Sequence, residues 1–256
     1  TIEKEGESTV AAFMAEPICS WAGQVVPPDG YWKRIREICD EKNILLIFDE
    51  VMTGFARTGK MFAYEHWGIV PDIVTYAKGI TCGYIPLGAC VINQKLADHF
   101  NEKGFPHSYT YSGHAVSCAT ALAVINHYEE ENLAENSAKR GVYMMDKLKG
   151  MMDRIPIIGD VRGMGLFMGV ELVKDRESKD SLVPKELDKE EKKDPEKNPM
   201  QYFTDKVKKN GLILSSSWGT SILRMMPALI ITEEQVDEGL KILEKTLEET
   251  IKKFDL

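Results

Sequence analysis

The stretch "DIVTYAKGITCGYIPLG", residues 72–88, joins an apolar run to a loop rich in glycine and proline. The run ends at Ala77, and a single cation, Lys78, follows at once. Two further runs, "ILLIF" at 44–48 and "LGACVI" at 87–92, are also apolar along their whole length. Strands that are apolar on both faces and are separated by helices are typical of a mostly parallel sheet covered on both sides. The sequence therefore predicts an α/β fold.

The periodicity of the remaining chain predicts a second, smaller region. The patterns predict a strand at 9–15, helices at 31–43, 115–133 and 134–152, a loop entering a strand at 158–173, and a final helix capped by Thr232. We expect a larger sheet domain over residues 1–125 and a smaller α+β domain over residues 126–256. Residues 174–200 carry 17 charged side chains, 8 positive and 9 negative, which indicates a solvated insertion.

The overall composition excludes several classes of protein. A net charge of -8 argues against a nucleic-acid-binding protein, which needs a basic face. No apolar segment reaches the ~18 residues of a membrane span, and no secretory signal opens the chain. The five cysteines show no metal-ligand spacing, so we expect no metal site and free thiols in the reducing cytoplasm.

Asp49 and Lys78 each follow a predicted strand, and such strand ends are where ligands bind in parallel sheets. They could form a structural ion pair, since a desolvated carboxylate needs a cationic partner. Alternatively, a ligand could lie between them. A desolvated lysine can form a Schiff base with a carbonyl, and an acid can keep a pyridine nitrogen protonated. These are the two protein groups that pyridoxal 5'-phosphate (PLP) requires. The spacing alone does not decide between the alternatives.

The surrounding sequence favours the ligand. Residues 45–89, "LLIFDEVMTGFARTGKMFAYEHWGIVPDIVTYAKGITCGYIPLGA", closely resemble the signature of the class III (subgroup II) aminotransferases. "AEPICSWAGQVVPPDGYW" before it and "HSYTYSGHAVSCATALA", "DVRGMGLFMGVEL" and "LRMMPALIITEEQVDEGL" after it resemble further family segments in the same order. The resemblance implies PLP-dependent transferase fold type I, with PLP as the cofactor.

The resemblance also implies roles for individual residues in cofactor binding. Lys78 would be the catalytic lysine that forms the Schiff base, and Asp49 the partner of the ring nitrogen. Val51 would pack on one face of the ring, and the glycines after Lys78 would let the flat ring approach the backbone. Thr110, in "YTYSG", matches a hydroxyl that reaches the PLP phosphate of the neighbouring subunit, which implies a homodimer with shared sites.

Other matched positions concern the substrate. Arg224, in "ILRMMPALI", matches the arginine that binds a substrate carboxylate, and its alternative is a salt bridge to an acid on the last helix. For Arg162 and Glu16 we expect structural roles and not roles in catalysis or substrate binding. Trp21 occupies the position of a glutamate that members acting on γ-aminobutyrate or ornithine carry, so those substrates are disfavoured.

The activity implied is transfer of an amino group from an ω-amino acid or amine, such as β-alanine or taurine, to pyruvate or 2-oxoglutarate. An aminomutase, racemase or decarboxylase of the same fold, or a non-catalytic subunit derived from it, remains an alternative. The family's phosphate-binding loop does not occur in residues 1–44. We therefore expect this chain to be a C-terminal portion whose N-terminal portion is a separate or missing chain.

Overall fold

A computed structural model describes residues 1–216 and 220–256. The chain forms two compact units: unit 1 contains residues 1–18 and 26–135, and unit 2 contains residues 19–25 and 136–256. The sequence pattern predicted a domain division at residue 125. The compact units divide after Glu135, and the short segment 19–25 groups with the later half of the chain.

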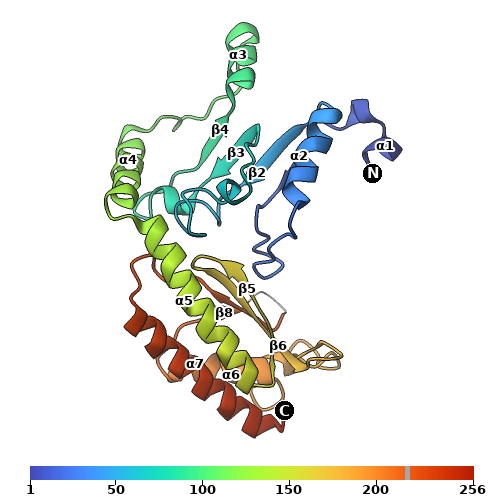
Figure 1. The fold of residues 1–256 in the computed structure, drawn as a ribbon, viewed down its shortest axis with the longest axis vertical. Helices are drawn as coiled ribbons and strands as arrows, with labels where there is room; N and C mark the ends of the chain where they lie inside the picture. Colours follow the sequence, from blue (N-terminus) through green and yellow to red (C-terminus); the bar gives the residue numbers. More distant parts are fainter. Residues whose placement is uncertain (217–219) are drawn as a thin grey trace. The chain divides into compact units, whose positions relative to one another are not determined.

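Unit 1 is built on a four-stranded sheet in the order β1-β2-β3-β4 (Figure 1). Its elements are α1 (Ile2–Glu5), η1 (Glu7–Thr9), β1 (Ala12–Ala15), α2 (Tyr31–Glu41), β2 (Leu45–Asp49), η2 (Ala63–Trp67), β3 (Ile73–Tyr76), η3 (Lys78–Ile80), β4 (Ala89–Ile92), α3 (Gln94–Lys103) and α4 (Ala115–Glu130). The pairs β1–β2 and β2–β3 are parallel, whereas β3–β4 is antiparallel. The prediction of an α/β fold with a mostly parallel sheet is confirmed.

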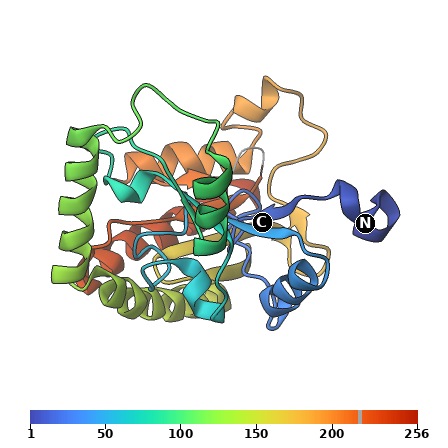
Figure 2. The same ribbon diagram turned by 90° about the horizontal axis from the view of Figure 1, so that it is seen from above.

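The helix α2 packs on this sheet through Trp32. Its indole ring meets the ring of Phe48 on β2 edge-on, with 4.6 Å between ring centroids, and its N–H donates to the carbonyl of Pro17 at 3.0 Å. The indole N–H has a hydrogen-bond partner, so burial of the ring stabilises this contact without leaving a buried donor unpaired. By contrast, α1 and α3 have no buried residue, and Figure 2 shows α1 at the margin of unit 1.

Unit 2 contains an antiparallel sheet in the order β5-β6-β9-β8, with β7 paired to β6. Its elements are α5 (Leu133–Arg154), which begins at the end of unit 1, β5 (Ile158–Met164), β6 (Phe167–Asp175), β7 (Asp180–Ser181), η4 (Glu191–Lys193), α6 (Pro199–Lys209), β8 (Ser215–Ser216), β9 (Ile222–Met225) and α7 (Glu233–Phe254). The mixture of antiparallel strands and helices is the α+β organisation expected for the later half of the chain.

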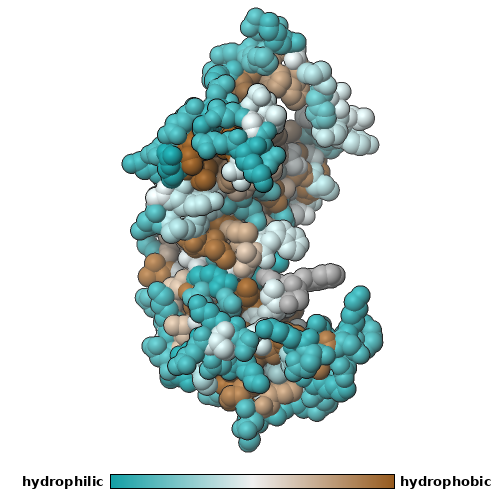
Figure 3. All heavy atoms as spheres, turned by 90° about the vertical axis from the view of Figure 1, so that its right-hand side faces the viewer, coloured by the Kyte–Doolittle hydropathy of each residue, from teal (hydrophilic) through white to brown (hydrophobic). Residues whose placement is uncertain are grey.

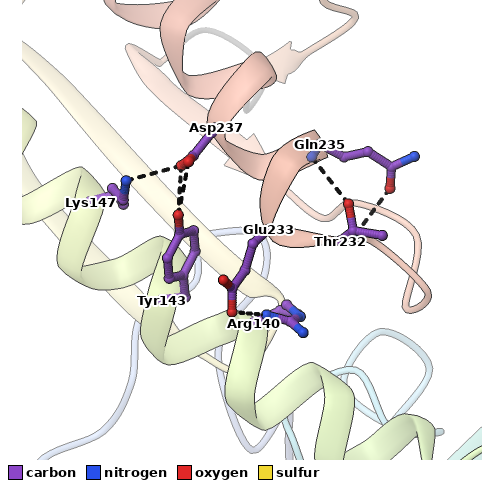
Figure 4. A network of polar contacts seen from close by, with 7 residues as sticks. All are labelled: Arg140, Tyr143, Lys147, Thr232, Glu233, Gln235 and Asp237. Atoms are coloured by element: carbon purple, nitrogen blue, oxygen red, sulfur yellow. Dashed lines mark hydrogen bonds and ion pairs between the residues drawn. The ribbon is translucent and has the colours of Figure 1, made fainter.

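The final helix begins as the sequence predicted. The Thr232 hydroxyl accepts a hydrogen bond from the Gln235 N–H at 3.3 Å, and the Gln235 side chain accepts one from the Thr232 N–H at 3.0 Å (Figure 4). This reciprocal capping box satisfies two donors that the first turn of a helix otherwise leaves free. The apolar residues of this helix are buried at Val236, Leu240, Leu243 and Leu247.

Acidic side chains of α7 pair with α5, which lies beside it. Glu233 bonds to Arg140, and Asp237 accepts a hydrogen bond from the Tyr143 hydroxyl at 2.9 Å and pairs with Lys147 at 3.1 Å (Figure 4). The charges on the facing surfaces of these two helices therefore compensate one another.

The prediction of a loop at the start of 158–173 was wrong, because residues 158–164 form strand β5. The glycines of this segment favoured the prediction of a loop. A Cβ on Gly159 would come within 2.8 Å of the Val173 side chain, and one on Gly163 would collide with the Phe167 carbonyl. These glycines allow two strands of a tight hairpin to approach closely, so here they belong to a sheet.

The charged segment 174–200 is mostly exposed, and in Figure 3 the lower surface, where this segment lies, is largely hydrophilic. Ion pairs such as Lys197–Glu191 at 2.8 Å and Lys193–Glu190 at 2.8 Å form within it. The prediction of a solvated insertion agrees with this surface. Among the helices that the structure describes, none combines the length and the apolar character needed to cross a membrane.

Candidate active site

Lys78 lies directly after β3, in the short turn η3 at the carboxyl end of the strand. Its backbone has φ of 43°, in the left-handed region that residues with a side chain rarely adopt. A Cβ on the next residue, Gly79, would lie 2.9 Å from the Cβ of Phe55. The glycine after Lys78 is therefore required by protein packing, which is a different reason from the approach of a ring that the sequence analysis expected.

The side chain of Lys78 is exposed and lines a cavity of about 700 Å³ in unit 1. The opposite part of the lining comes from the segment between α3 and α4, including Tyr109, Tyr111 and Ser112. Within the part of the chain that the structure describes, the Lys78 ammonium group has no ion pair and no hydrogen bond. The amine is thus accessible from a cavity and uncommitted to any protein partner.

Asp49 is the last residue of β2 and pairs in register with Thr75 of β3, three residues before Lys78. One carboxylate oxygen, Oδ1, accepts a hydrogen bond from the N–H of Val51 at 2.9 Å. This bond fixes the carboxylate against its own strand end and leaves the other oxygen able to accept a further donor. Asp49 is half-buried and is not part of the lining of the Lys78 cavity.

The alternative of a structural Asp49–Lys78 ion pair is not observed. Across residues 1–216 and 220–256, no contact within 4.0 Å joins the two charged groups. The two groups nevertheless lie at the same edge of the sheet, because β2 and β3 are parallel neighbours whose carboxyl ends meet there. Thr75, the register partner of Asp49, has a buried hydroxyl for which the described residues offer no hydrogen-bond partner.

Thr110 lies in the exposed segment between α3 and α4. Its neighbours Tyr109 and Tyr111 line the Lys78 cavity, but Thr110 itself does not. Unit 1 alone therefore gives Thr110 no polar role in this cavity. Its predicted contact with the phosphate of a neighbouring subunit remains a prediction.

Arg162 and Arg224 flank the same residue of the unit 2 sheet. Arg162 on β5 and Arg224 on β9 both pair in register with Gly169 on β6. Residues directly opposite one another in a sheet point to the same face. On this face a Cβ at Gly169 would lie 2.6 Å from the carbonyl of Gly23, so the segment 19–25 covers the row between the two arginines.

The environments of the two arginines differ. Arg162 donates to the Gly23 carbonyl at 2.8 Å and pairs with Asp160 and Glu171, each at 2.6 Å. The structural interpretation of Arg162 is therefore confirmed. Arg224 has no ion pair among the described residues, and its buried Nε has no hydrogen-bond partner. The alternative of a salt bridge from Arg224 to the last helix is not observed.

Trp21 belongs to the segment 19–25, which packs with unit 2, and its side chain is 76% exposed. The same segment carries Gly23, which covers Gly169 between the two arginines. Trp21 and Arg224 are thus held by one unit, whereas Lys78, Asp49, Val51 and Thr110 are held by the other.

Glu50 is a polar residue of this region that the sequence analysis did not single out. Its side chain is 0% exposed, and it accepts hydrogen bonds from the Thr53 hydroxyl at 2.5 Å and the Tyr64 N–H at 3.0 Å. Burial raises the pKa of the Glu50 carboxyl, and these hydrogen bonds oppose the rise. The residue ties the loop after Asp49 back to the strand end. Its position directly after a predicted buried strand could have indicated that its side chain is buried.

Comparison with known proteins gives the family. The chain matches the class III aminotransferase family over residues 1–247, and it belongs to that family. The taurine–pyruvate aminotransferase of Bilophila wadsworthia is 38% identical over 98% of this chain and 55% of its own length. The leucine/methionine racemase of Thermococcus litoralis is 42% identical over 93% of this chain and 50% of its own length.

A solved structure agrees with the sequence relatives. The taurine:2-oxoglutarate aminotransferase from Bifidobacterium kashiwanohense, in complex with PLP and glutamate, matches with a TM-score of 0.90 and 33% identity, over 98% of this chain and 54% of that chain. The fold type I assignment is therefore confirmed. The chain spans about half the length of the curated relatives it matches.

The residues at the edge of the unit 1 sheet fit PLP, the cofactor of this family. An unpaired amine at Lys78 and a carboxylate at Asp49 with one oxygen free stand at neighbouring strand ends. Thr75, the register partner of Asp49, has a buried hydroxyl without a hydrogen-bond partner among the described residues. An aldehyde and a protonated pyridine nitrogen are the complementary groups for this amine and this carboxylate.

Proposed function

We propose that this chain is the lysine-bearing half of a PLP-dependent aminotransferase. The enzyme moves an amino group from an ω-amino acid or amine, such as taurine or β-alanine, to pyruvate or 2-oxoglutarate. The observation that carries the proposal is the accessible, unpaired Lys78 amine beside Asp49 at the strand ends of a class III fold. The reaction is ping-pong, because the deaminated donor leaves before the acceptor binds.

Lys78 performs two tasks in this proposal. When bound, PLP supplies an aldehyde and an electron-withdrawing ring. The Lys78 amine would hold the aldehyde carbon covalently, with release of water, until an amino donor takes its place. The freed Nζ, which no carboxylate neutralises in the described residues, would then be able to take the proton from the substrate carbon that bears the nitrogen.

Asp49 and Val51 hold the cofactor ring. The free oxygen of Asp49 would accept a hydrogen bond from the protonated ring nitrogen and keep that proton in place. The Val51 N–H, bonded to Oδ1 at 2.9 Å, keeps the carboxylate oriented while it does so. The Val51 side chain packs on one face of the ring.

Arg224 binds the carboxylate of the substrate. Its guanidinium has no competing acid among the described residues, and a planar fork of donors matches a carboxylate bidentately. Trp21, which belongs to the same unit, has an apolar indole that cannot neutralise the arginine by charge. An arginine of this kind favours substrates that carry a carboxylate or a sulfonate.

A racemase is the second candidate, because a relative that is 42% identical carries that name. The two candidates separate in a half-reaction. An aminotransferase given amino donor alone converts its cofactor to pyridoxamine phosphate and releases a carbonyl product. A racemase returns the cofactor unchanged and inverts the amino acid instead.

We further propose that the active enzyme contains an N-terminal portion and assembles as a homodimer in the cytoplasm. Unit 1 exposes large aromatic side chains at Tyr84, Phe105, Tyr109 and Tyr111, of which Tyr84 is 83% exposed. Exposed apolar groups gathered in one region are typical of an interaction surface. Thr110 lies among them and would reach the phosphate held by the neighbouring subunit. Five free cysteines suit a reducing compartment.

The test compares the wild-type holoenzyme with Lys78→Ala. Reduction with borohydride followed by peptide mass spectrometry is expected to find the cofactor on Lys78, and amino donors are screened against both acceptors. Lys78→Ala is expected to lose roughly 1,000-fold or more in turnover. Lys95→Ala, which removes an exposed lysine of α3, is the matched control and is expected to behave as wild type. Normal turnover by Lys78→Ala would overturn the proposal.

The assembly is tested by native mass spectrometry of the active material. We expect this chain together with an N-terminal portion, in a mass that corresponds to two copies of each. A single active species of 28.9 kDa would contradict both the partner and the dimer.

A further inference from the structure

Tyr128, on α4, reaches the turn that carries Lys78. Its side chain is 4% exposed, and its hydroxyl donates a hydrogen bond to the carbonyl of Gly79 at 2.9 Å. Its ring stacks on the ring of Phe55 with an interplanar angle of 26°. Phe55 is also the residue against which Gly79 packs. The residue directly after Lys78 is therefore held from two sides by aromatic groups.

A second contact joins Tyr128 to the far end of the same turn. The Sγ of Cys82 lies 3.0 Å from the Tyr128 hydroxyl oxygen. A phenol has one proton, and here it is donated to Gly79, so the Cys82 thiol is the donor in this contact. Burial raises the pKa of Tyr128, as does the bond to Cys82, whereas the nearby positive charge of Arg57 opposes the rise. The hydroxyl thus remains protonated and able to donate.

The turn needs such support because its backbone is strained. Lys78 has φ of 43° and Cys82 has φ of 49°, both in the left-handed region. Residues with a side chain persist in this region only where the surrounding structure determines their conformation. Since the Lys78 ammonium group has no partner among the described residues, the direction of its side chain depends on the backbone of this turn.

We propose that Tyr128 is a positioning residue for Lys78. Its hydroxyl anchors the turn at Gly79 and Cys82, so that the amine is presented to the aldehyde of the cofactor. This inference rests on the proposed function, because it assigns the amine an aldehyde partner.

The test uses Tyr128→Phe, which removes one oxygen and keeps the ring stacked on Phe55. Affinities of the apoenzyme for PLP and for pyridoxamine phosphate are measured separately. Only PLP has the aldehyde that bonds to Lys78, so pyridoxamine phosphate reports the pocket without the lysine. We expect the affinity for PLP to fall about tenfold and that for pyridoxamine phosphate to change by less than about twofold, because a misdirected amine affects only the covalent step.

Tyr143→Phe is the matched control, since it removes the same atom from a hydroxyl that bonds to Asp237 in unit 2. It is expected to leave both affinities unchanged. Cys82→Ala removes the thiol that contacts both the Tyr128 hydroxyl and the Gly79 carbonyl, and it is expected to lower PLP affinity about threefold in the same selective way. It supplies the test if Tyr128→Phe does not fold.

The outcomes separate the two hypotheses. Equal loss of both affinities, or no loss, in Tyr128→Phe overturns the positioning role while wild-type PLP binding at Lys78 stands. A wild-type enzyme that forms no bond between PLP and Lys78 overturns the proposed function, and the positioning role with it.

Discussion

In unit 2, acidic and basic side chains satisfy one another, whereas the two ionisable groups at the sheet edge of unit 1 do not. Helices α5 and α7 pair through Arg140–Glu233 and Lys147–Asp237, and Arg162 pairs with two acids. At the carboxyl edge of the unit 1 sheet, Lys78 has no acid and Asp49 has no cation among the described residues. Lys78 is exposed and solvated, so the cost of an unpaired charge falls on the half-buried Asp49, where a donor group on a ligand would offset it.

Arg224 is an exception to the pairing of charged side chains in unit 2. It lies in unit 2, opposite the same glycine as Arg162, and yet it has no ion pair in the described part of the chain. The contrast between compensated and uncompensated groups therefore separates residues within one sheet as well as between units. The predictions below test it by removing one group of each kind.

After Lys78→Ala, the largest effect is expected for Asp49→Asn. An amide cannot keep the ring nitrogen of the cofactor protonated, so kcat/KM is expected to fall roughly 100-fold or more. Thermal unfolding is expected to change little, because no cation in the described structure depends on the carboxylate. Steady-state kinetics and melting curves of the holoenzyme check both. A variant with unchanged kinetics would show that this unpaired carboxylate has no ligand.

Arg224→Leu is expected to act on substrate selection. Loss of a charged hydrogen-bonding partner is expected to lower kcat/KM for 2-oxo acid acceptors about 10- to 100-fold. Amino donors without a carboxylate are expected to be affected less. Kinetics with matched donors, with and without a carboxylate, give the comparison. Equal losses for both donor types would exclude a carboxylate-binding role.

Arg162→Leu is expected to lower the stability of the protein and to leave substrate selection unchanged, which is the opposite of the effect of Arg224→Leu. The substitution leaves Asp160, Glu171 and the Gly23 carbonyl without their shared donor. We expect a loss of about 2 kcal/mol in the free energy of unfolding, with substrate preference unchanged. Denaturant titration measures the loss. A change in substrate preference without a loss of stability would indicate that Arg162, and not Arg224, binds the substrate.

Thr232→Ala removes the hydroxyl that caps α7. The expected loss is about 1 kcal/mol in the free energy of unfolding, with no change in PLP binding. Thr232→Ser keeps the hydroxyl and is expected to retain most of the stability. The pair shows whether unit 2 can be weakened without disturbing the lysine site of unit 1.

The smallest effect is expected for Glu50→Gln. Because folding raises the pKa of Glu50, the folded state binds more protons than the unfolded state, and stability falls as pH rises from about 4.5 through the folded pKa. The glutamine variant lacks this titration, so its melting temperature is expected to depend less on pH in that window. Melting curves from pH 4 to pH 7 make the measurement. An identical pH dependence in both proteins would exclude Glu50 as its source.

The sequence predicted the elements whose pattern is local. The apolar runs before Asp49 and before Lys78 became β2 and β3, and the capped apolar stripe after Thr232 became α7. The segment 158–164 was misread, because its glycines serve a close approach between strands that no local pattern records. Roles for Thr110 and Trp21 came from family resemblance and remain predictions.

Long-range contacts explain what was missed at the site. Tyr128 is separated by 49 positions from Gly79, and nothing in the helical pattern around it marks its hydroxyl as different from that of any other tyrosine. Family resemblance already separated the two arginines. The register adds that both lie opposite Gly169, and the contacts show that Arg162 has acidic partners whereas Arg224 has none among the described residues.

The first strand of the unit 1 sheet has a consequence for handling the protein. Among the described residues, β1 pairs only with β2, so its other side presents a row of free backbone donors and acceptors. An open strand of this kind is a template on which other chains can add. Purified alone, this polypeptide is therefore expected to aggregate, and co-expression with a segment that completes the sheet is expected to keep it dispersed.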